Sequence, residues 1–501
     1  MSQRVRIVAI LAIIGIFVLS FTQIESRSKS YKTLKDYYSQ ELEWKSCYDN
    51  YQCTEFDVPI DYSDLSVGTF QISALRFQAQ DQKRRIGSLI VNPGGPGASG
   101  VQYAYNAEYL FDPDITDRYD IVGFDPRGVS DSEPIVCLSS QELDENFAAD
   151  SKPDNDQELE QSIKDSKDFI EKCQKKVPHL DAYSTANAAR DMDILRALVG
   201  DTKLNYMGKS YGTYLGALYA SLFPNNIGRV VLDGALDPSI SNLDQTINQA
   251  EGFEQALNAF IKDCIASKSC PLPKNINDAR DTLINLFATT AKKPLPLKDS
   301  SKDKRVVTEA LVVLGTASGL YDSGDGWSLL RDAIEEALNG YGDTYLELAD
   351  LYTGRLEDGS YPNNEFESGA IINCLDFAEE RDIKQIKKDA ELVAKASPIF
   401  GPYLGYGGLV CRNLPAVKPV EVGIVKTKAP IIIIGTTGDP ATPYAWAQGL
   451  HRVLTNSQLM TFVGDGHTGQ GRGNACIDDA IDAYYLKGLL PKADLTCKAL
   501  A

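Results

Sequence analysis

Short apolar segments bounded by turn residues recur in two separate parts of the chain. In each part, helical patterns such as Ala189, Met192 and Leu195 lie between them. The apolar segments are 88–92, 119–124, 203–207, 229–232, 430–435 and 458–463. Strands that alternate with helices predict an α/β fold with a mostly parallel sheet and helices on both faces.

The middle of the chain has a different pattern. Between 239 and 426, helical segments occur at 253–265, 327–338 and 383–395, without a convincing series of strands. Helices inserted between strands of one sheet predict a cap over the carboxyl ends of those strands, where open α/β sheets bind ligands. We therefore expect a core at 31–238, a mainly helical cap at 239–426, and the rest of the core at 427–501.

Residues 1–30 read as a targeting segment. Arg4 and Arg6 precede an apolar run at 7–21, and no A-x-A-like cleavage site follows. The run is long for a signal-peptide core and short for a membrane span. Either a cleaved signal peptide or an uncleaved N-terminal anchor fits, and both predict an exported protein.

Composition excludes some partners. The formal net charge of −19 argues against binding to nucleic acid or anionic membranes through bulk electrostatics. Membrane contact is expected only through the N-terminal segment.

The ten cysteines agree with export, because an even count in an exported chain indicates disulfides. Sequential pairing is expected, since each bond would then close one local loop. No C-x-x-C occurs and only three histidines are present, so we expect no metal site, and no cofactor. The expected pairs are Cys47–Cys53, Cys137–Cys173, Cys264–Cys270, Cys374–Cys411 and Cys476–Cys497.

The pentad Gly208-Lys209-Ser210-Tyr211-Gly212 stands between a predicted strand and a predicted helix. A serine on such a turn is an exposed nucleophile, and the flanking glycines leave room for the crowded backbone. A serine in an ordinary glycine turn is the plain alternative. The context of strand and helix favours Ser210 as a nucleophile.

A serine nucleophile needs a base, and only His179, His451 and His467 are available. His467 is favoured because it lies in a glycine-rich loop directly after an apolar strand. Asp439 follows the strand before it and completes the order Ser, Asp, His. Asp465 is a competitor, but it is too near His467 in sequence to face it easily.

A tetrahedral intermediate also needs two amide donors for its oxyanion. One is expected to be the backbone N–H of Tyr211, directly after the nucleophile. The other is expected in the glycine turn after the strand at 88–92, at Gly95.

Four motifs carry a resemblance to a known family. Asn92-Pro93-Gly94-Gly95-Pro96-Gly97, the segment 124–128, the pentad at 208–212 and the segment 438–443 resemble those of the tripeptidyl aminopeptidases. These are exported bacterial α/β-hydrolases related to proline iminopeptidases, and the resemblance runs from about 53 to 497. It implies a serine exopeptidase with the triad Ser210, Asp439 and His467.

An aminopeptidase must recognise a free α-ammonium, which calls for a carboxylate in a partly desolvated cap. Asp376 is the first candidate, because Cys374-Leu375-Asp376 resembles a segment of this family. Glu379 and Glu380 are further candidates, although a charged helix face toward solvent is the favoured explanation for these two.

The sequence thus predicts an exported serine aminopeptidase that acts on peptides with a free N-terminus and forms an acyl-enzyme. An esterase or a proline iminopeptidase-like enzyme on the same fold is the alternative, because fold does not fix the substrate. A non-catalytic binding protein that kept the hydrolase fold is a third, remote reading.

Overall fold

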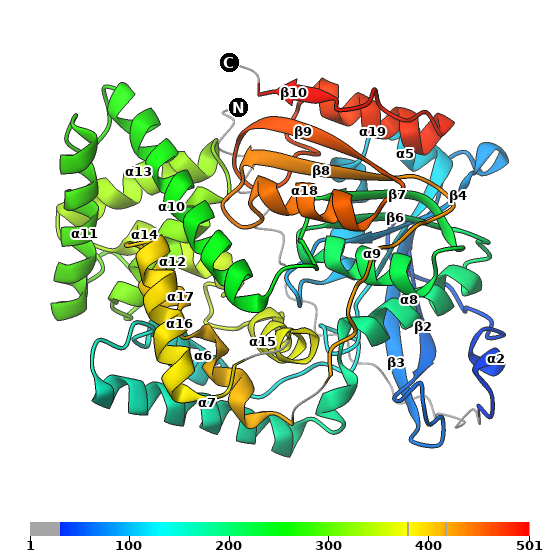
Figure 1. Ribbon diagram of the computed structural model, residues 1–501, viewed down its shortest axis with the longest axis horizontal. Helices are drawn as coiled ribbons and strands as arrows, with labels where there is room; N and C mark the ends of the chain where they lie inside the picture. The colour runs from blue at the N-terminus through cyan, green and yellow to red at the C-terminus, as the bar shows by residue number, and fades with distance from the viewer. Residues whose placement is uncertain (1–30, 378–379, 416–417, 500–501) are drawn as a thin grey trace.

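The computed structural model describes residues 31–377, 380–415 and 418–499, and it contains one ten-stranded sheet beside a layer of helices (Figure 1). The predicted targeting segment and Glu379 lie outside the described residues. The strands are β1 (Lys45–Tyr48), β2 (Tyr51–Pro59), β3 (Thr69–Phe77), β4 (Gly87–Asn92), β5 (Tyr119–Phe124), β6 (Leu204–Lys209), β7 (Ile227–Asp233), β8 (Ile431–Gly438), β9 (Ser457–Asp465) and β10 (Thr496–Lys498).

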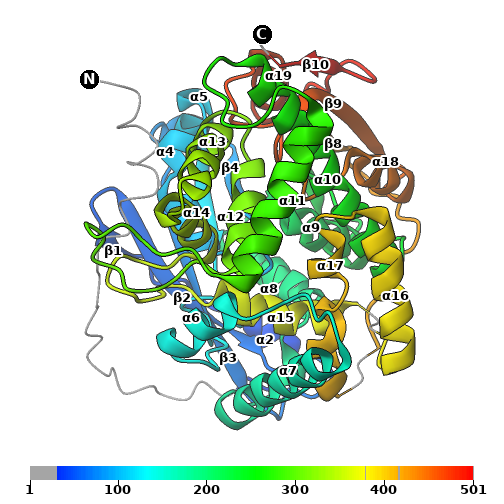
Figure 2. The same ribbon diagram turned by 90° about the vertical axis from the view of Figure 1, so that its left-hand side faces the viewer.

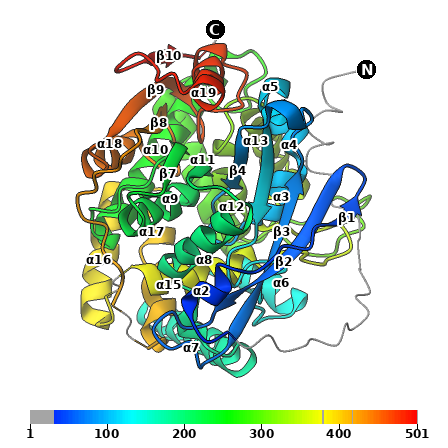
Figure 3. The same cartoon turned by 90° about the vertical axis from the view of Figure 1, so that its right-hand side faces the viewer.

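The sheet order is β1-β2-β3-β5-β4-β6-β7-β8-β9-β10. Strands β1, β2, β3 and β5 pair antiparallel, and every other neighbour pair is parallel. Figure 3 views the side that carries β2 and β3. The chain passes from β4 to β5 on one side and then to β6 on the other, so the order reverses between β4 and β6. Such a switch point leaves a crevice at the carboxyl ends of the strands.

Both faces of the sheet are covered, which explains why β4 and β5 are buried along their whole length. Apolar residues of α8, α9 and α18 pack on one face, and those of α3, α4, α5 and α19 pack on the other. The bounds are α3 (Gly100–Tyr105), α4 (Ala107–Leu110), α5 (Pro113–Arg118), α8 (Thr185–Leu198), α9 (Tyr211–Leu222), α18 (Tyr444–Val453) and α19 (Ala475–Lys487).

Helices α10 to α17 follow β7 and form the second layer, seen face on in Figure 2. Most of these helices share an apolar core that includes Phe260, Trp327 and Tyr345 and is separate from that of the sheet. The helix at 365–376 instead packs on the core of the sheet, through Ile371 and Leu375 among others. These helices are α10 (Asn242–Ala266), α11 (Ile276–Lys292), α12 (Glu309–Leu320), α13 (Asp325–Leu338), α14 (Asp343–Thr353), α15 (Glu365–Asp376), α16 (Ile383–Ala396) and α17 (Gly401–Leu404).

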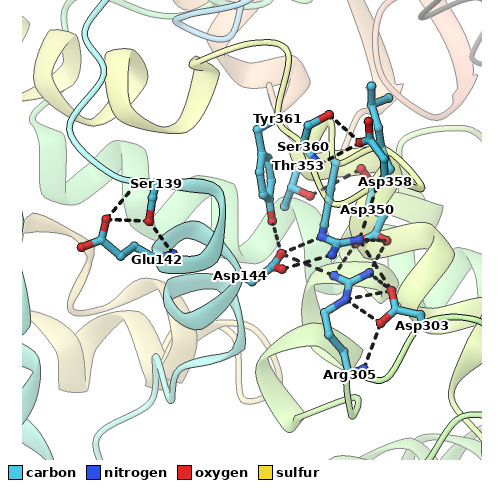
Figure 4. Close-up of polar contacts among 12 residues, drawn as sticks. Ser139, Glu142, Asp144, Asp303, Arg305, Asp350, Thr353, Asp358, Ser360 and Tyr361 are labelled. Atoms are coloured by element: carbon cyan, nitrogen blue, oxygen red, sulfur yellow. Dashed lines mark hydrogen bonds and ion pairs between the residues drawn. The ribbon is translucent and has the colours of Figure 1, made fainter. Parts of the chain in front are cut away.

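Two helices from the first part of the chain, α6 (Ser140–Ala148) and α7 (Asp156–Lys176), lie against this layer (Figure 1). An ion-pair network fastens α6 to it, as Figure 4 shows. Arg355 donates to Asp144 of α6, and Arg305 binds Asp303 and Asp350. Burial alone would raise the pKa of Asp303, but Arg305 and Arg355 lower it to about 2. The helical layer is thus built from two separate parts of the sequence.

The remaining short elements are α2 (Leu34–Tyr37), η1 (Gln82–Arg84), η2 (Leu180–Ala182) and η3 (Gly407–Asn413).

The predicted α/β fold with a mostly parallel sheet and the sequential disulfide pairing are confirmed. The polar segment at 156–176 forms the helix α7. The Asn155 side chain caps this helix by accepting from the N–H groups of Gln157 and Glu158. Within the described residues, no helix combines the length and apolar character needed to cross a membrane.

Candidate active site

Ser210 occupies the sharp turn between β6 and α9, at the switch point of the sheet. Its φ of 53° and ψ of −126° lie in a strained region for a residue with a side chain. The Ser210 N–H donates to the Asp233 carbonyl at 2.9 Å, which fixes the turn against β7. A Cβ atom on Gly212 would lie 2.8 Å from Asn92 Oδ1, so this position has room only for glycine.

The turn after β4 packs directly against this serine. Gly94 and Gly95 have φ values of 113° and 105°, and the Asn92 side chain accepts from the Gly94 N–H at 3.1 Å. A Cβ on Gly94 would lie 2.9 Å from Ser210 Cβ and 3.2 Å from Tyr211 N. The turn predicted to bind the oxyanion is therefore adjacent to the predicted nucleophile.

Asp439 and His467 contact each other at the carboxyl ends of β8 and β9. His467 Nδ1 lies 2.9 Å from Asp439 Oδ1 and 3.0 Å from Oδ2. Asp439 is 3% exposed, and its carboxylate also accepts from the N–H groups of Ala441, Thr442 and Thr468. A carboxylate at Nδ1 places the proton there, so Nε2 is left as the acceptor.

Asp233, the last residue of β7, links the nucleophile turn to the histidine loop. Its carbonyl accepts from Ser210, while its buried carboxylate accepts from the N–H groups of Gly469 and Gln470. Lys209 adds a hydrogen bond to the Gln470 carbonyl at 2.9 Å. The three loops at the sheet edge are thus joined by hydrogen bonds, those to the histidine loop coming from the side chains of Asp233 and Lys209.

The alternative bases lie elsewhere. His179 is exposed before η2, and His451 is on α18, where Nδ1 contacts Ser457 Oγ at 2.8 Å. Asp465 makes no hydrogen bond to His467 among the described residues; the hydrogen bonds from Ser323 and Arg472 in this region go to its backbone carbonyl. The observed histidine–carboxylate pair is the one favoured by the sequence.

Two contacts of the helical layer with the site involve residues that the sequence did not indicate. At the first, the backbone carbonyl of Tyr321, which follows α12, accepts from the backbone N–H of His467 at 2.8 Å. Its ring meets the imidazole edge to face, with centroids 5.2 Å apart. Ser323 donates to the Asp465 carbonyl at 2.9 Å and accepts from Arg472 at 2.9 Å.

At the second place, helix α15 packs on the glycine turn after β4, which we call the oxyanion turn for its predicted role. Asn364 precedes the helix and is buried, with its side chain bound to the backbone of Gly128, Ser130 and Ile135. The Glu365 carboxylate faces Gly95: Oε1 would lie 3.2 Å from a Cβ on that glycine. No pattern in the sequence singles out this glutamate.

The three predicted amine-binding residues have different surroundings. Asp376, at the end of α15, is buried and accepts from both the N–H and the hydroxyl of Thr185. The Thr185 hydroxyl also contacts the Tyr211 hydroxyl, so Asp376 supports the residue after the nucleophile. Burial raises the pKa of Asp376 to about 7.

Glu380 is exposed and accepts from the N–H groups of Arg381 and Asp382 just before α16. Glu379 lies outside the described residues. Amine binding by these three residues stays a prediction.

A pocket of about 230 Å³ opens beside the oxyanion turn. Its wall includes Pro93 of the turn, Gln102 and Tyr103 of α3, Asn106, and Asn363 and Glu365 at the start of α15. Within the described residues, no group of three or more His, Cys, Asp or Glu side chains is placed to hold a metal ion.

Comparison with known proteins gives consistent matches over most of the chain. The alpha/beta hydrolase fold family matches residues 87–473. Serine protease Hip1 of Mycobacterium tuberculosis is 33% identical, with 89% of this chain and 87% of that protein covered. Carboxylesterase B of the same species is 34% identical (89% and 86% covered), and the tripeptidyl aminopeptidase of Streptomyces lividans is 31% identical (91% and 86% covered).

Proposed function

Because this chain belongs to the alpha/beta hydrolase fold family, in the group that includes the tripeptidyl aminopeptidases, we propose that it is an exported serine aminopeptidase. It would release short peptides, tripeptides above all, from substrates with a free N-terminus. The observation that carries the proposal is the His467–Asp439 pair at the sheet edge where a strained serine meets a glycine turn. The five disulfides support export, because such bonds persist in oxidising compartments.

In this mechanism Ser210 Oγ attacks the scissile carbonyl while His467 Nε2 takes its proton. Asp439 keeps the imidazole in the required tautomer and stabilises the imidazolium that forms. The N–H groups of Gly95 and Tyr211 bind the developing oxyanion. His467 then gives the proton to the leaving amine, and water hydrolyses the acyl-enzyme by the same steps in reverse order.

The exported protein is tested with a chromogenic tripeptide amide that has a free amino group and with its N-acetylated twin. We expect a strong preference for the free amine, measured as kcat/KM. Equal or reversed rates would contradict an aminopeptidase.

Esterase activity is the second candidate, because a relative of similar identity is named carboxylesterase B. The triad would be the same, since fold does not fix the substrate. Rapid cleavage of short acyl esters, together with slow cleavage of every peptide amide, would favour it over the peptidase.

A further inference from the structure

The carboxylate of Glu365 is enclosed by the site but has no partner. Among the described residues, no hydrogen bond or ion pair reaches it, and it accepts from none of the N–H groups of α15. It is half-buried, and burial raises its pKa to about 7. A desolvated carboxylate without a cation is unfavourable, so a ligand that brings a positive charge would be stabilised there.

Glu365 lies beside the glycine turn after β4, where its Oε1 approaches Gly95. Its carboxylate also interacts electrostatically with Tyr321 and Tyr352. The ring of Tyr321 contacts His467, and the ring of Tyr352 packs against that of Tyr321 at 5.8 Å between centroids. Any cation bound by Glu365 would therefore lie close to the reacting carbonyl.

The titratable groups near the Glu365 carboxylate are neutral phenols, so a positively charged partner would have to be supplied by a ligand. The titratable groups that interact with its carboxylate are the phenols of Tyr321 and Tyr352, and Tyr103 lines the same pocket. Burial raises the pKa of Tyr321 well above its usual range, so this phenol remains neutral. The buried Tyr103 hydroxyl also lacks a partner within the described residues.

The start of α15 is fastened, so the carboxylate has a defined position. Asn364 binds the loop after β5, and Glu367 accepts from the N–H groups of Cys137 and Leu138. Glu365 lies between these two anchors. A carboxylate held beside the glycine turn can measure the length of a substrate, because an extended peptide spans at most about 3.3–3.6 Å per residue.

We propose that Glu365 binds the α-ammonium group of the substrate and thereby restricts cleavage to short N-terminal peptides. This inference rests on the proposed aminopeptidase function. It also distinguishes the two ends of α15: Asp376 is already engaged by Thr185, whereas Glu365 is open to the pocket. The ammonium would make a charge-assisted hydrogen bond to the carboxylate, with the N-terminal residue in the pocket beside it.

The test compares Glu365→Gln with the wild-type protein on the free tripeptide amide and on its N-acetylated twin. We expect kcat/KM for the free amine to fall about 10- to 100-fold, mainly through KM, because a hydrogen bond to a charged group is lost. The N-acetylated substrate should be unaffected, so the preference for the free amine collapses. Glu391→Gln on the exposed surface of α16 is the matched control.

Asp376→Asn and Glu380→Gln test the other candidate carboxylates in the same assay. If either of them removes the preference while Glu365→Gln keeps it, Glu365 is not the amine-binding residue. Equal losses on both substrates would also overturn the inference, because they indicate a structural role. If the wild-type protein itself shows no preference, the aminopeptidase proposal fails first.

Glu365→Asp provides a second variant if Glu365→Gln does not fold. It keeps the charge but withdraws it by one methylene, so we expect the preference for a free amine to persist and the optimal peptide length to shift. A series of chromogenic amides with one to four residues measures that shift. An unchanged length profile together with unchanged preference would overturn the inference.

The pH profile adds a readout that a structural role would not change. The ratio of kcat/KM between the free and acetylated substrates cancels the ionisation of His467. For the wild type this ratio should rise as pH increases toward about 7, because Glu365 becomes charged. For Glu365→Gln it should be flat over the same range.

Discussion

The sheet edge and the helical layer contribute to the candidate site in different ways. At the sheet edge, the two buried carboxylates are paired: Asp439 accepts from His467 and three backbone N–H groups, and Asp233 joins the serine turn to the histidine loop. In the helical layer, Glu365 has no partner among the described residues. Paired groups suit chemistry, which needs fixed geometry, whereas an unpaired buried charge suits recognition of a ligand.

The helical layer also contacts the histidine, through both the backbone and the ring of Tyr321. The Tyr321 carbonyl accepts from the backbone N–H of His467, and the Tyr321 ring contacts the imidazole edge to face. The layer is itself rigidly joined, since Arg305 and Arg355 bind the carboxylates of Asp144, Asp303 and Asp350. We therefore predict large losses of kcat for substitutions at the sheet edge, and smaller or substrate-dependent losses for substitutions in the helical layer.

The largest effect is expected at the nucleophile. Ser210→Ala removes the attacking oxygen and should lower kcat by at least about 10⁴-fold. The unfolding temperature should hardly change, because no described hydrogen bond uses the hydroxyl. Activity near that of the wild type would contradict the triad and, with it, the role given to the sheet edge.

Asp439→Asn should lower kcat by about 10⁴-fold, because the amide no longer holds the imidazole in the required tautomer. Asp465→Asn is a matched control, since this residue is nearer in sequence to His467 but does not bind it. Steady-state kinetics measure both variants. A larger loss for Asp465→Asn would reverse the assignment.

Gly95→Ala should lower kcat by about 10²–10³-fold, the loss typical of one oxyanion donor. The glycine has a φ of 105°, and an added Cβ would lie 2.7 Å from Gly97 N, so the turn must move. The control is Gly340→Ala, also at positive φ but with open space around it. Equal activity of the two variants would argue against an oxyanion role for this turn.

Tyr321→Ala tests whether the helical layer positions the histidine. We expect kcat to fall about tenfold with little change in KM, because the backbone contact can remain while the ring no longer restrains the imidazole. Tyr321→Phe keeps the ring and should retain most of that kcat. If both substitutions act only on KM, the ring serves binding and does not position the base.

The smallest effect concerns stability. Burial raises the pKa of Glu365 to about 7, so the folded protein binds this proton more tightly than the unfolded chain does. The stabilising contribution is complete below the unfolded pKa and is lost as pH rises through about 7. Glu365→Gln lacks this dependence, so its unfolding temperature relative to wild type should increase by about 1–3 °C from pH 5 to pH 8. A constant difference in calorimetry would show that the carboxyl is not desolvated.

The sequence alone determined the elements that depend on local patterns. Alternating apolar segments predicted the parallel sheet, and the glycine-flanked Ser210 predicted the turn, because only a few residue types permit such backbone geometry. The scarcity of histidine reduced the choice of base to three, and the even number of cysteines predicted disulfides.

Only the tertiary structure decided which carboxylates are engaged and which are open. Glu365 begins helix α15 and Asp376 ends it. Thr185 donates a hydrogen bond to the Asp376 carboxylate, whereas no described residue pairs with the Glu365 carboxylate. Their partners come from segments far away in the chain, as do the contacts of Tyr321 with the histidine loop. Burial and pairing of charges depend on how distant segments pack, and no local pattern of residues records that arrangement.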